Sequence, residues 1–518
     1  MATTSNSFPL PSGAAPSTTA SRPETVRRAV LAAMCLFLLF WLGYFIDKTW
    51  HWSLVNDAPQ LSYLIFLMKH GMKPYRDIIE MNMPGTYLVH FAVLGMLGWS
   101  DLAWRVFDVL LIGVIGTAMV VIAWPYSRAA GIFSAVLFAL FHGRDGMGET
   151  GERDLVIAAL LLVAYACLFQ VLRHGRAWPM LFVGFCAGYA ATIKPIPLPM
   201  ALLLVAVGVL AFRREARSIW SPLLFGLAGL AIAFAIVGGF LVHEGVLGLF
   251  LREEHEMLPF YAHLGDFDPH WMLMNSSTSS FRTLAVLALV LTMAMRCWRS
   301  WEERLLLTGI AFGIFSYFYQ QKGTPYHRYP MIAFTLLWCG IVFFQALRQR
   351  GWMRWVAVGA VGYGVVLAPL YARTAAKRPW SQDYEEGLTR DLNALGGAGL
   401  SGHVQCLATS AECDTVLYRM KLMQATGLAY DYFVFNRRPG PVVTESQQRF
   451  WSQLEQNPPR AIVVTVGLYP SDRFGYDKLS LWPAFADYLG AHYRLYADRQ
   501  FPMFEQRAIA YRLYVRKD

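Results

Sequence analysis

Long apolar segments recur along the whole chain and constrain its fold more than any other feature. Ten segments are predominantly apolar over about 17 to 24 residues, the length that a helix needs to cross a bilayer. They are 30–46, 103–123, 154–172, 177–193, 195–211, 219–242, 281–297, 303–319, 330–346 and 352–371, with two shorter ones at 84–99 and 131–142. Only 15% of the 518 residues are charged, and 56% are apolar. The sequence therefore predicts an α-helical polytopic membrane protein.

The connections between these segments alternate between arginine-rich and acidic ones. By the positive-inside rule the arginine-rich set faces the cytoplasm, and the loops around 142–154, 243–280 and 320–330 lie outside, as does everything after residue 372. The arginines concerned are Arg128, Arg173, Arg176, Arg213, Arg214, Arg217, Arg296, Arg299, Arg304, Arg348, Arg350 and Arg354.

Segment 84–99 is a poor membrane-spanning segment. It has about 16 residues, opens with Pro84-Gly85 and contains Gly95 and Gly98, so we expect it to be re-entrant or interfacial. About eleven crossings follow, with the N-terminus in the cytoplasm and the C-terminus outside. A hidden extra pair, giving thirteen, is the alternative.

Three regions follow from the composition. Residues 1–27, rich in Ser, Thr, Pro and Ala, predict a disordered cytoplasmic tail. Residues 28–372 form the transmembrane domain, whose first outer loop is 47–102. Residues 373–518 are polar, with two strand-like apolar runs and several helix-like segments, and predict an extracytoplasmic α/β domain. The strand-like runs are 403–408 and 461–466, and the helix-like segments are 384–395, 446–456 and 482–490.

Cysteine placement agrees with this division. Of the seven cysteines, only Cys406 and Cys413 fall in the outer domain, and they are close enough in sequence to form a disulfide in an oxidising compartment. Two free thiols are the alternative.

The net charge of +10 does not indicate nucleic-acid binding. No run of Lys or Arg is interleaved with aromatic residues on a polar segment, as a nucleic-acid groove requires. We therefore expect membrane lipids, and no nucleic acid, among the partners.

The start of the first outer loop is the most informative stretch. Leu61, Leu64, Ile65 and Met68 follow helical spacing, so 59–70 is predicted to be an amphipathic helix on the membrane surface. Asp57 stands immediately before this helix. Its simplest role is a helix cap, and a catalytic carboxylate is the alternative.

The motifs of this loop resemble those of polytopic glycosyltransferases with the GT-C fold. They are Asp57, Tyr63, Gly71, Pro74-Tyr75-Arg76-Asp77 and Asn82-Met83-Pro84-Gly85-Thr86-Tyr87-Leu88. The chain is most similar to the glycosyltransferase family 39 type, which includes protein O-mannosyltransferases and lipid A aminoarabinose transferases. The resemblance covers the membrane part, about 350 residues.

The resemblance implies a polyprenyl-phosphate sugar as donor and an acid of the first outer loop as catalytic base, which is Asp57 here. It also makes Tyr63, Arg76, Asp77 and Asn82 candidates for substrate binding. One departure stands out. The family often has two adjacent acids at this point, whereas this chain has Asn56-Asp57.

A departing lipid phosphate needs cations. Loop 320–330 supplies Lys322, His327 and Arg328, with loop anchoring at the membrane surface as the alternative. Arg105 and Lys194 are further candidates, and the alternative for Arg105 is an ion pair with Asp108.

The glycine-rich loop 142–154 gathers four acids against Arg144 and Arg153. A solvated or self-paired turn is the favoured interpretation, and a divalent metal site is the alternative, since GT-C oligosaccharyltransferases use a second acidic loop in this way. The metal candidates are Asp145, Glu149, Glu152 and Asp154. No cofactor is certain.

The predicted function is an inverting glycosyltransferase of the cell inner (plasma) membrane. It moves a sugar from a polyprenyl-phosphate donor to a hydroxyl acceptor on a lipid, a glycan or a protein, on the extracytoplasmic face. A flippase or transporter of a lipid-linked glycan, or a non-catalytic subunit of envelope assembly, are the alternatives.

Overall fold

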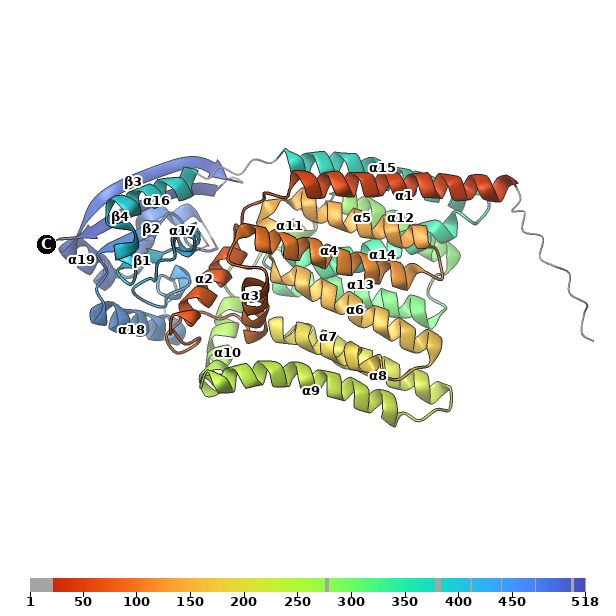
Figure 1. The fold of residues 1–518 in the computed structure, drawn as a ribbon, viewed down its shortest axis with the longest axis horizontal. Coiled ribbons are helices and arrows are strands. Elements are labelled where there is room, and N and C mark those ends of the chain that lie inside the picture. The colour runs from red at the N-terminus through yellow and green to blue at the C-terminus, as the bar shows by residue number, and fades with distance from the viewer. Residues whose placement is uncertain are drawn as a thin grey trace, which may run out of the picture.

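The computed structural model describes residues 22–274, 279–377, 383–409, 412–438, 440–470, 472–504 and 507–517. A bundle of long helices is capped at one end by a domain that contains a β-sheet (Figure 1). Residues 1–21 of the predicted tail lie outside the described residues. Its last six residues begin the first helix, where Arg28 binds Glu24 at 2.5 Å one turn away.

Eleven of the described helices make up the bundle and lie roughly parallel to one another (Figure 1). They are α1 (Arg22–Lys48), α4 (Asp101–Ala123), α5 (Arg128–Asp145), α6 (Arg153–His174), α7 (Met180–Ile193), α8 (Leu198–Arg214), α9 (Trp220–His243), α12 (Ser279–Met295), α13 (Trp301–Gln320), α14 (Tyr329–Ala346) and α15 (Trp352–Ala376). Each corresponds to one predicted span. Six of them, α1, α4, α6, α9, α14 and α15, are long and apolar enough to cross a membrane, and α7 and α12 are shorter apolar helices.

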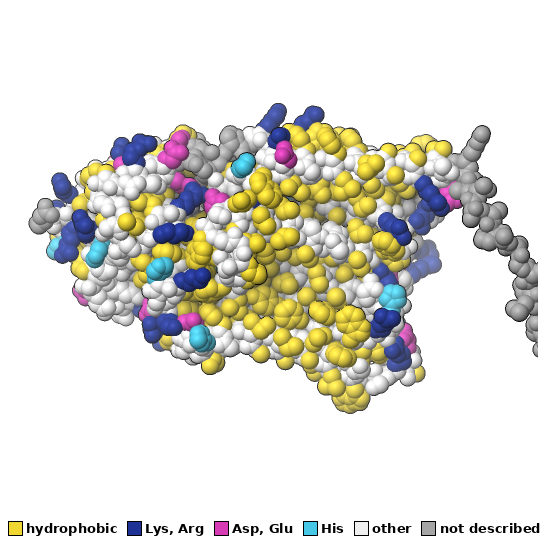
Figure 2. All heavy atoms as spheres, viewed as in Figure 1, with side chains coloured by type: hydrophobic (Ala, Val, Ile, Leu, Met, Phe, Trp, Pro, Cys, Tyr) yellow, Lys and Arg dark blue, Asp and Glu magenta, His cyan; other side chains and the backbone are white. Residues whose placement is uncertain are grey.

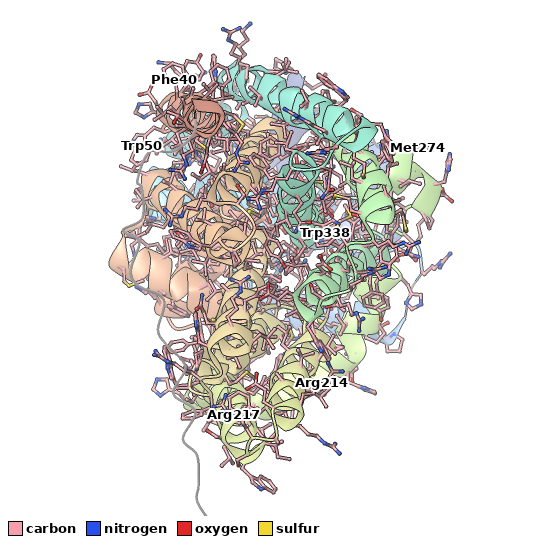
Figure 3. All side chains as sticks on the ribbon, turned by 90° about the vertical axis from the view of Figure 1, so that its right-hand side faces the viewer. Phe40, Trp50, Arg214, Arg217, Met274 and Trp338 are labelled. Atoms are coloured by element: carbon pink, nitrogen blue, oxygen red, sulfur yellow. A yellow bond between two sulfur atoms is a disulfide. The ribbon has the colours of Figure 1, made fainter. Side chains whose placement is uncertain are left out.

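The bundle has a buried centre and an apolar outer surface. Helix α14 is buried almost throughout, and its Trp338 lies near the middle when the bundle is viewed end on, whereas Phe40 of α1 lies at the rim (Figure 3). Apolar side chains cover the face of the bundle shown in Figure 2, and large exposed apolar residues occur on other bundle helices as well. A surface of this kind requires lipid around it, so the chain is an integral membrane protein.

The arginine-rich connections gather at the end of the bundle opposite the capping domain (Figure 2). Arg173 binds Glu302 at 2.8 Å, and Arg348 donates to the carbonyl of Tyr126 at 2.7 Å, so distant connections meet there. Exposed tryptophans mark the same end, as expected at a membrane interface. They are Trp124, Trp178, Trp220, Trp298, Trp301, Trp352 and Trp355.

This arrangement makes a prediction about topology. Because arginine-rich connections remain in the cytoplasm, an export-dependent reporter fused after residue 372 should be active, and the same reporter fused near Arg214 or Arg350 should be silent. Reporter activity in intact cells is the measurement, with fusion expression checked by immunoblot. An active reporter near Arg214 would reverse the proposed orientation.

The first outer loop packs between the bundle and the capping domain. It holds α2 (Asp57–Lys69) and α3 (Pro84–Met96). At 13 residues α3 is too short to cross the bilayer, in agreement with an interfacial segment.

The helix predicted at 59–70 is present as α2, but the expectation that it lies open on the membrane surface is wrong. Residues 58–67 of α2 are all buried, because the capping domain covers the face that the sequence suggested was solvated. Tyr63 donates to the carbonyl of Leu422 at 3.0 Å, and Gln60 donates to that of Ala429 at 2.5 Å.

The C-terminal domain is α/β, as predicted. Its four-stranded sheet has the order β1-β2-β4-β3, with β1 and β2 parallel and the other pairs antiparallel. The strands are β1 (Val404–Leu407), β2 (Ala461–Thr465), β3 (Tyr493–Phe504) and β4 (Arg507–Arg516), and the helices are α16 (Asp383–Ala394), α17 (Glu412–Met420), α18 (Pro441–Gln456) and α19 (Pro483–His492). The hairpin β3-β4 and helix α17 were not predicted.

The predicted disulfide is confirmed. Cys406 of β1 and Cys413 of α17 are joined. Helix α17 packs against α2, so the disulfide ties the sheet to the element that covers the first outer loop.

Candidate active site

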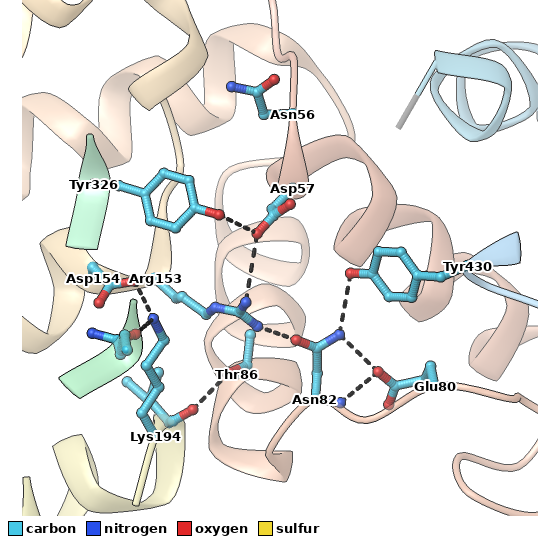
Figure 4. Close-up of polar contacts among 12 residues, drawn as sticks. Asn56, Asp57, Glu80, Asn82, Thr86, Arg153, Asp154, Lys194, Tyr326 and Tyr430 are labelled. Atoms are coloured by element: carbon cyan, nitrogen blue, oxygen red, sulfur yellow. Dashed lines mark hydrogen bonds and ion pairs between the residues drawn. The ribbon is translucent and has the colours of Figure 1, made fainter. Parts of the chain in front are cut away.

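Asp57 is the first residue of α2, and its carboxylate points away from the helix backbone. The N-cap is Asn56, which makes no side-chain cap bond. Asp57 Oδ2 accepts from the Tyr326 hydroxyl at 3.1 Å and lies 3.5 Å from Nη2 of Arg153 (Figure 4). The helix-cap interpretation of Asp57 is therefore wrong, and its Oδ1 has no hydrogen-bond partner among the described residues.

Asn56 stands where the resemblance would place a second acid. Its φ of 62° and ψ of −133° lie outside the left-handed helical region, in a conformation that residues other than glycine rarely adopt. Its Nδ2 donates to the carbonyl of Gly148 at 2.9 Å. This hydrogen bond joins the first outer loop to loop 142–154. An ionised carboxylate could not make it, because it has no hydrogen-bond donor.

Arg153, at the start of α6, joins two predicted site residues. It pairs with Asp57 through Nη2 and donates to Asn82 Oδ1 through Nη1, while its Nε is buried without a partner. From the sequence alone, Arg153 is expected only to neutralise the nearby acids. One feature of the sequence could have indicated a role in the site. Arg153 begins its span at the acidic end, opposite the arginine-rich connections.

Asn82, a predicted substrate-binding residue, lies next to Arg153. Glu80 Oε2 accepts from the backbone N–H of Asn82 at 2.6 Å and from its side-chain Nδ2 at 2.7 Å. Burial raises the pKa of Glu80 to about 8, so this acid is mostly protonated at neutral pH. Asn82 Nδ2 also reaches the hydroxyl of Tyr430 in the C-terminal domain at 3.5 Å.

The other predicted substrate-binding residues lie elsewhere in the first outer loop. Tyr63 is buried against the C-terminal domain, where it binds Leu422. Arg76 is exposed and pairs with Asp77 at 2.8 Å, and Asp77 Oδ2 accepts from the N–H of Lys73 at 2.7 Å. These contacts hold the loop in shape, and the substrate-binding role of the three residues stays a prediction.

A cavity of about 380 Å³ opens beside this network. Apolar side chains form most of its wall, namely Met81, Met83, Ile193, Pro195, Ile196, Pro199, Leu258, Ala262 and Phe315. Phe315 and Tyr319 of α13 line it and are 52% and 67% exposed, so the cavity reaches the lipid-facing surface of the bundle. Its polar residues are Asn82, Arg153, Lys194, Gln320, Lys322 and His327, with the hydroxyls of Tyr261 and Tyr319.

Lys194 lies in the cavity wall where α7 ends. Its Nζ donates to Asp154 Oδ2 at 2.7 Å and to Gln320 Oε1 at 2.9 Å. Burial lowers the pKa of Lys194, and the neighbouring Asp154 carboxylate opposes that shift. An ammonium group has three N–H donors, and the third has no acceptor among the described residues.

Of the three predicted cations in loop 320–330, Lys322 and His327 line the cavity and Arg328 does not. Lys322 lines the cavity, but its Nζ donates to the carbonyls of Tyr261, Ala262 and Leu264 at 3.1, 3.0 and 2.5 Å, at the end of α10 (Leu247–Ala262). These bonds favour the anchoring alternative. His327 also lines the cavity, and burial together with the charge of Lys194 lowers its pKa well below the usual range. Its ring is therefore neutral.

Arg328 and Arg105 do not line the cavity. Arg328 is buried and binds Asp145 at 2.9 Å. Arg105 donates to Thr49 Oγ1 at 2.5 Å and lies 3.8 Å from Asp108, which agrees with the ion-pair alternative. The phosphate role of both residues stays a prediction.

Two of the predicted metal candidates are neutralised by cations. Asp145 binds Arg328 at 2.9 Å, and Asp154 binds Lys194 at 2.7 Å. An ion at either carboxylate would have to displace a buried positive charge.

The other two metal candidates are no better suited. Glu149 accepts from the Tyr329 hydroxyl at 3.1 Å. Glu152 is buried with neither oxygen hydrogen-bonded, and burial and the charge of Asp57 raise its pKa well above the usual range. No group of three His, Cys, Asp or Glu side chains in the described part of the chain could hold an ion. These residues do not fit a divalent metal.

Comparisons with known proteins identify the fold. No protein-family model and no curated protein matches the sequence. The crystal structure of ArnT from Cupriavidus metallidurans bound to undecaprenyl phosphate matches with a TM-score of 0.56 and 13% identity, over 95% of this chain and 98% of that one. The apo form matches with a TM-score of 0.54 and 14% identity, over 93% and 98%. The chain has the GT-C fold.

The GT-C fold extends here through both parts of the molecule, because the match spans almost the whole of each chain. The predicted fold class is thereby confirmed, including a C-terminal domain that follows the bundle. Asp57, Arg153 and Lys194 lie where the first outer loop of this GT-C chain meets the bundle (Figure 4).

Proposed function

We propose that this chain is an inverting glycosyltransferase that uses a polyprenyl-phosphate sugar as donor. One observation carries the proposal: a lipid-accessible apolar cavity ends at Lys194 and Arg153, next to the carboxylate of Asp57. An apolar wall suits a polyprenyl chain, and two cations suit its phosphate. The ArnT structure of the same fold holds undecaprenyl phosphate, which supports this choice of donor.

The cations stabilise the leaving group. Lys194 retains an N–H without an acceptor, and Arg153 has a buried Nε without a partner. A phosphate at the polar end of the cavity would satisfy such donors. The charge that develops on the phosphate as the bond to sugar C1 breaks is then met by preorganised donors in a site shielded from water.

Asp57 serves as the general base. Tyr326 and Arg153 hold Oδ2, which leaves Oδ1 to accept the proton of the acceptor hydroxyl. The acceptor oxygen forms a bond to sugar C1 as the C1–O bond breaks, and the phosphate departs with the electron pair on the opposite face. The sugar is transferred with inversion, and a positioned base contributes roughly 10²–10⁴-fold to the rate.

The reaction takes place on the extracytoplasmic face of the inner (plasma) membrane. The site lies at the end of the bundle away from the arginine-rich connections, and the positive-inside rule supports this side. The acceptor is a hydroxyl of a lipid, a glycan or a protein.

The cation at the cavity end provides a test. Lys194→Gln removes a charged hydrogen bond to the phosphate, which contributes about 1.5–3 kcal/mol, so binding of undecaprenyl phosphate should weaken by about 10- to 150-fold. Titration of purified protein in detergent measures this. Lys48→Gln removes the same charge from an exposed side chain at the same end of the bundle and should change the affinity less than about twofold. Equal affinities of Lys194→Gln and the wild type would contradict the proposed phosphate site.

A further inference from the structure

A segment of the C-terminal domain, residues 427–433, is built into the site. Ile79 of the first outer loop forms a parallel bridge with Leu428, with backbone bonds of 2.8 and 3.2 Å to Gly427 and Ala429. Gln60 of α2 donates to the carbonyl of Ala429 at 2.5 Å. The segment is therefore fixed to the helix that begins at Asp57 and to the loop that carries Asn82.

Aromatic rings connect this segment to the cavity. The Tyr430 hydroxyl approaches Nδ2 of Asn82, on the other side of that amide from Arg153 (Figure 4). Tyr430 stacks on Tyr432 with ring centroids 5.1 Å apart, and Tyr432 lies 6.4 Å from Tyr261 of α10. Tyr261 lines the cavity. Three tyrosines thus form a layer from Asn82 to the cavity wall.

A buried ion pair fixes the residue between the two stacked tyrosines. Asp431 binds Lys478 at 2.5 Å, and both side chains are completely buried in the C-terminal domain. The N–H of Asp431 also donates to the carbonyl of Ala408 beside the sheet, at 3.0 Å. Desolvating two charges is costly, and here the pair holds Tyr430 and Tyr432 at set positions.

We propose that Tyr261 and Tyr430 contact the glycosyl group of the donor, with Tyr432 as a positioning residue between them. This inference rests on the proposed function. With the phosphate held at Lys194 and Arg153, the sugar attached to it lies close to Asn82. A sugar ring has C–H faces that pack on aromatic rings and hydroxyls that bind polar tips, and tyrosine offers both. The C-terminal domain thereby supplies part of the donor site.

The test compares lipids with and without a sugar. Undecaprenyl phosphate and undecaprenyl phosphate linked to glucose, mannose or arabinose are titrated into the full-length protein, and the sugar lipid that the wild type binds most tightly is kept as the probe. Tyr261→Leu and Tyr430→Phe should each weaken binding of that probe about 5- to 30-fold, on the scale of lost ring and hydroxyl contacts. Binding of undecaprenyl phosphate should change less than about twofold, which also shows that the variants are folded.

Controls separate a contact from a structural effect. Tyr261→Phe keeps the ring and should recover most of the affinity lost in Tyr261→Leu. Tyr488→Leu makes the same change in α19, away from the site, and should leave both affinities near the wild-type values.

Each contrary result has a distinct meaning. Equal losses for both lipids, or no loss for either, would overturn the sugar subsite. A wild-type protein that binds no sugar lipid more tightly than undecaprenyl phosphate would overturn the subsite alone. Binding of neither lipid would overturn the proposed function and the subsite with it.

Discussion

Replacing Asp57 with asparagine should lower the rate of glycosyl transfer by about 10²-fold or more. The amide fits the same space and can still accept hydrogen bonds from Tyr326 and Arg153, so the site should keep its shape. Helix α2 should also be unaffected, because its N-cap is Asn56. The amide cannot accept a proton from the acceptor hydroxyl. The measurement is kcat for release of undecaprenyl phosphate, with donor binding measured on the same variant.

Asp47→Asn is the matched control, since Asp47 is an exposed acid at the start of the same outer loop and pairs with Lys48. It should retain most of the wild-type rate. A nearly normal rate for Asp57→Asn would exclude Asp57 as the base, and the ion-paired acids Asp77 and Asp154 would be the next candidates.

Lys478→Met should destabilise the C-terminal domain by about 3–5 kcal/mol, because it leaves the buried Asp431 carboxylate without its partner. The free energy of unfolding of the domain, measured by proteolysis at increasing urea concentration, is the readout. The double variant Lys478→Met with Asp431→Leu should recover much of the loss, since no unpaired charge remains.

The exposed pair Arg512–Asp498 provides the comparison for that measurement. Its side chains are more than a third exposed, so Arg512→Met should change the free energy of unfolding by less than about 1 kcal/mol. If Lys478→Met were no more destabilising than Arg512→Met, the buried pair could not be what holds residues 430–432 in place.

The membrane helices could be predicted from the sequence because the thickness of the bilayer sets the length of each apolar segment, whatever the rest of the chain does. The span predicted at 131–142 is part of α5, and the segment opened by Pro84 forms the short interfacial helix α3. Burial of α2 could not be predicted in this way, because the face that looks polar in sequence is covered by residues more than 350 positions later in the chain.

Some of the predicted site residues lie close together, whereas the partners of others could not be predicted. Asp57 and Asn82 both contact Arg153, and Asn82 and Lys194 line the same cavity (Figure 4), while their roles stay predictions. Arg328 instead forms an ion pair with Asp145, and Lys322 donates to three backbone carbonyls. Such partners depend on the tertiary fold. Arg153 was missed for the same reason, since its sequence neighbours are acids whereas its partners Asp57 and Asn82 lie about 70 to 100 residues earlier.

Sugar transfer in sealed vesicles tests the central claim most directly. Purified protein is reconstituted with the radiolabelled undecaprenyl-phosphate sugar that it binds and with a cell-envelope extract as acceptor. Free undecaprenyl phosphate and labelled acceptor are then quantified together. The wild type should produce the two in equal amounts, and the Asp57→Asn variant about 1% as much or less. Movement of the intact donor across the bilayer without release of undecaprenyl phosphate would contradict a glycosyltransferase and indicate a flippase.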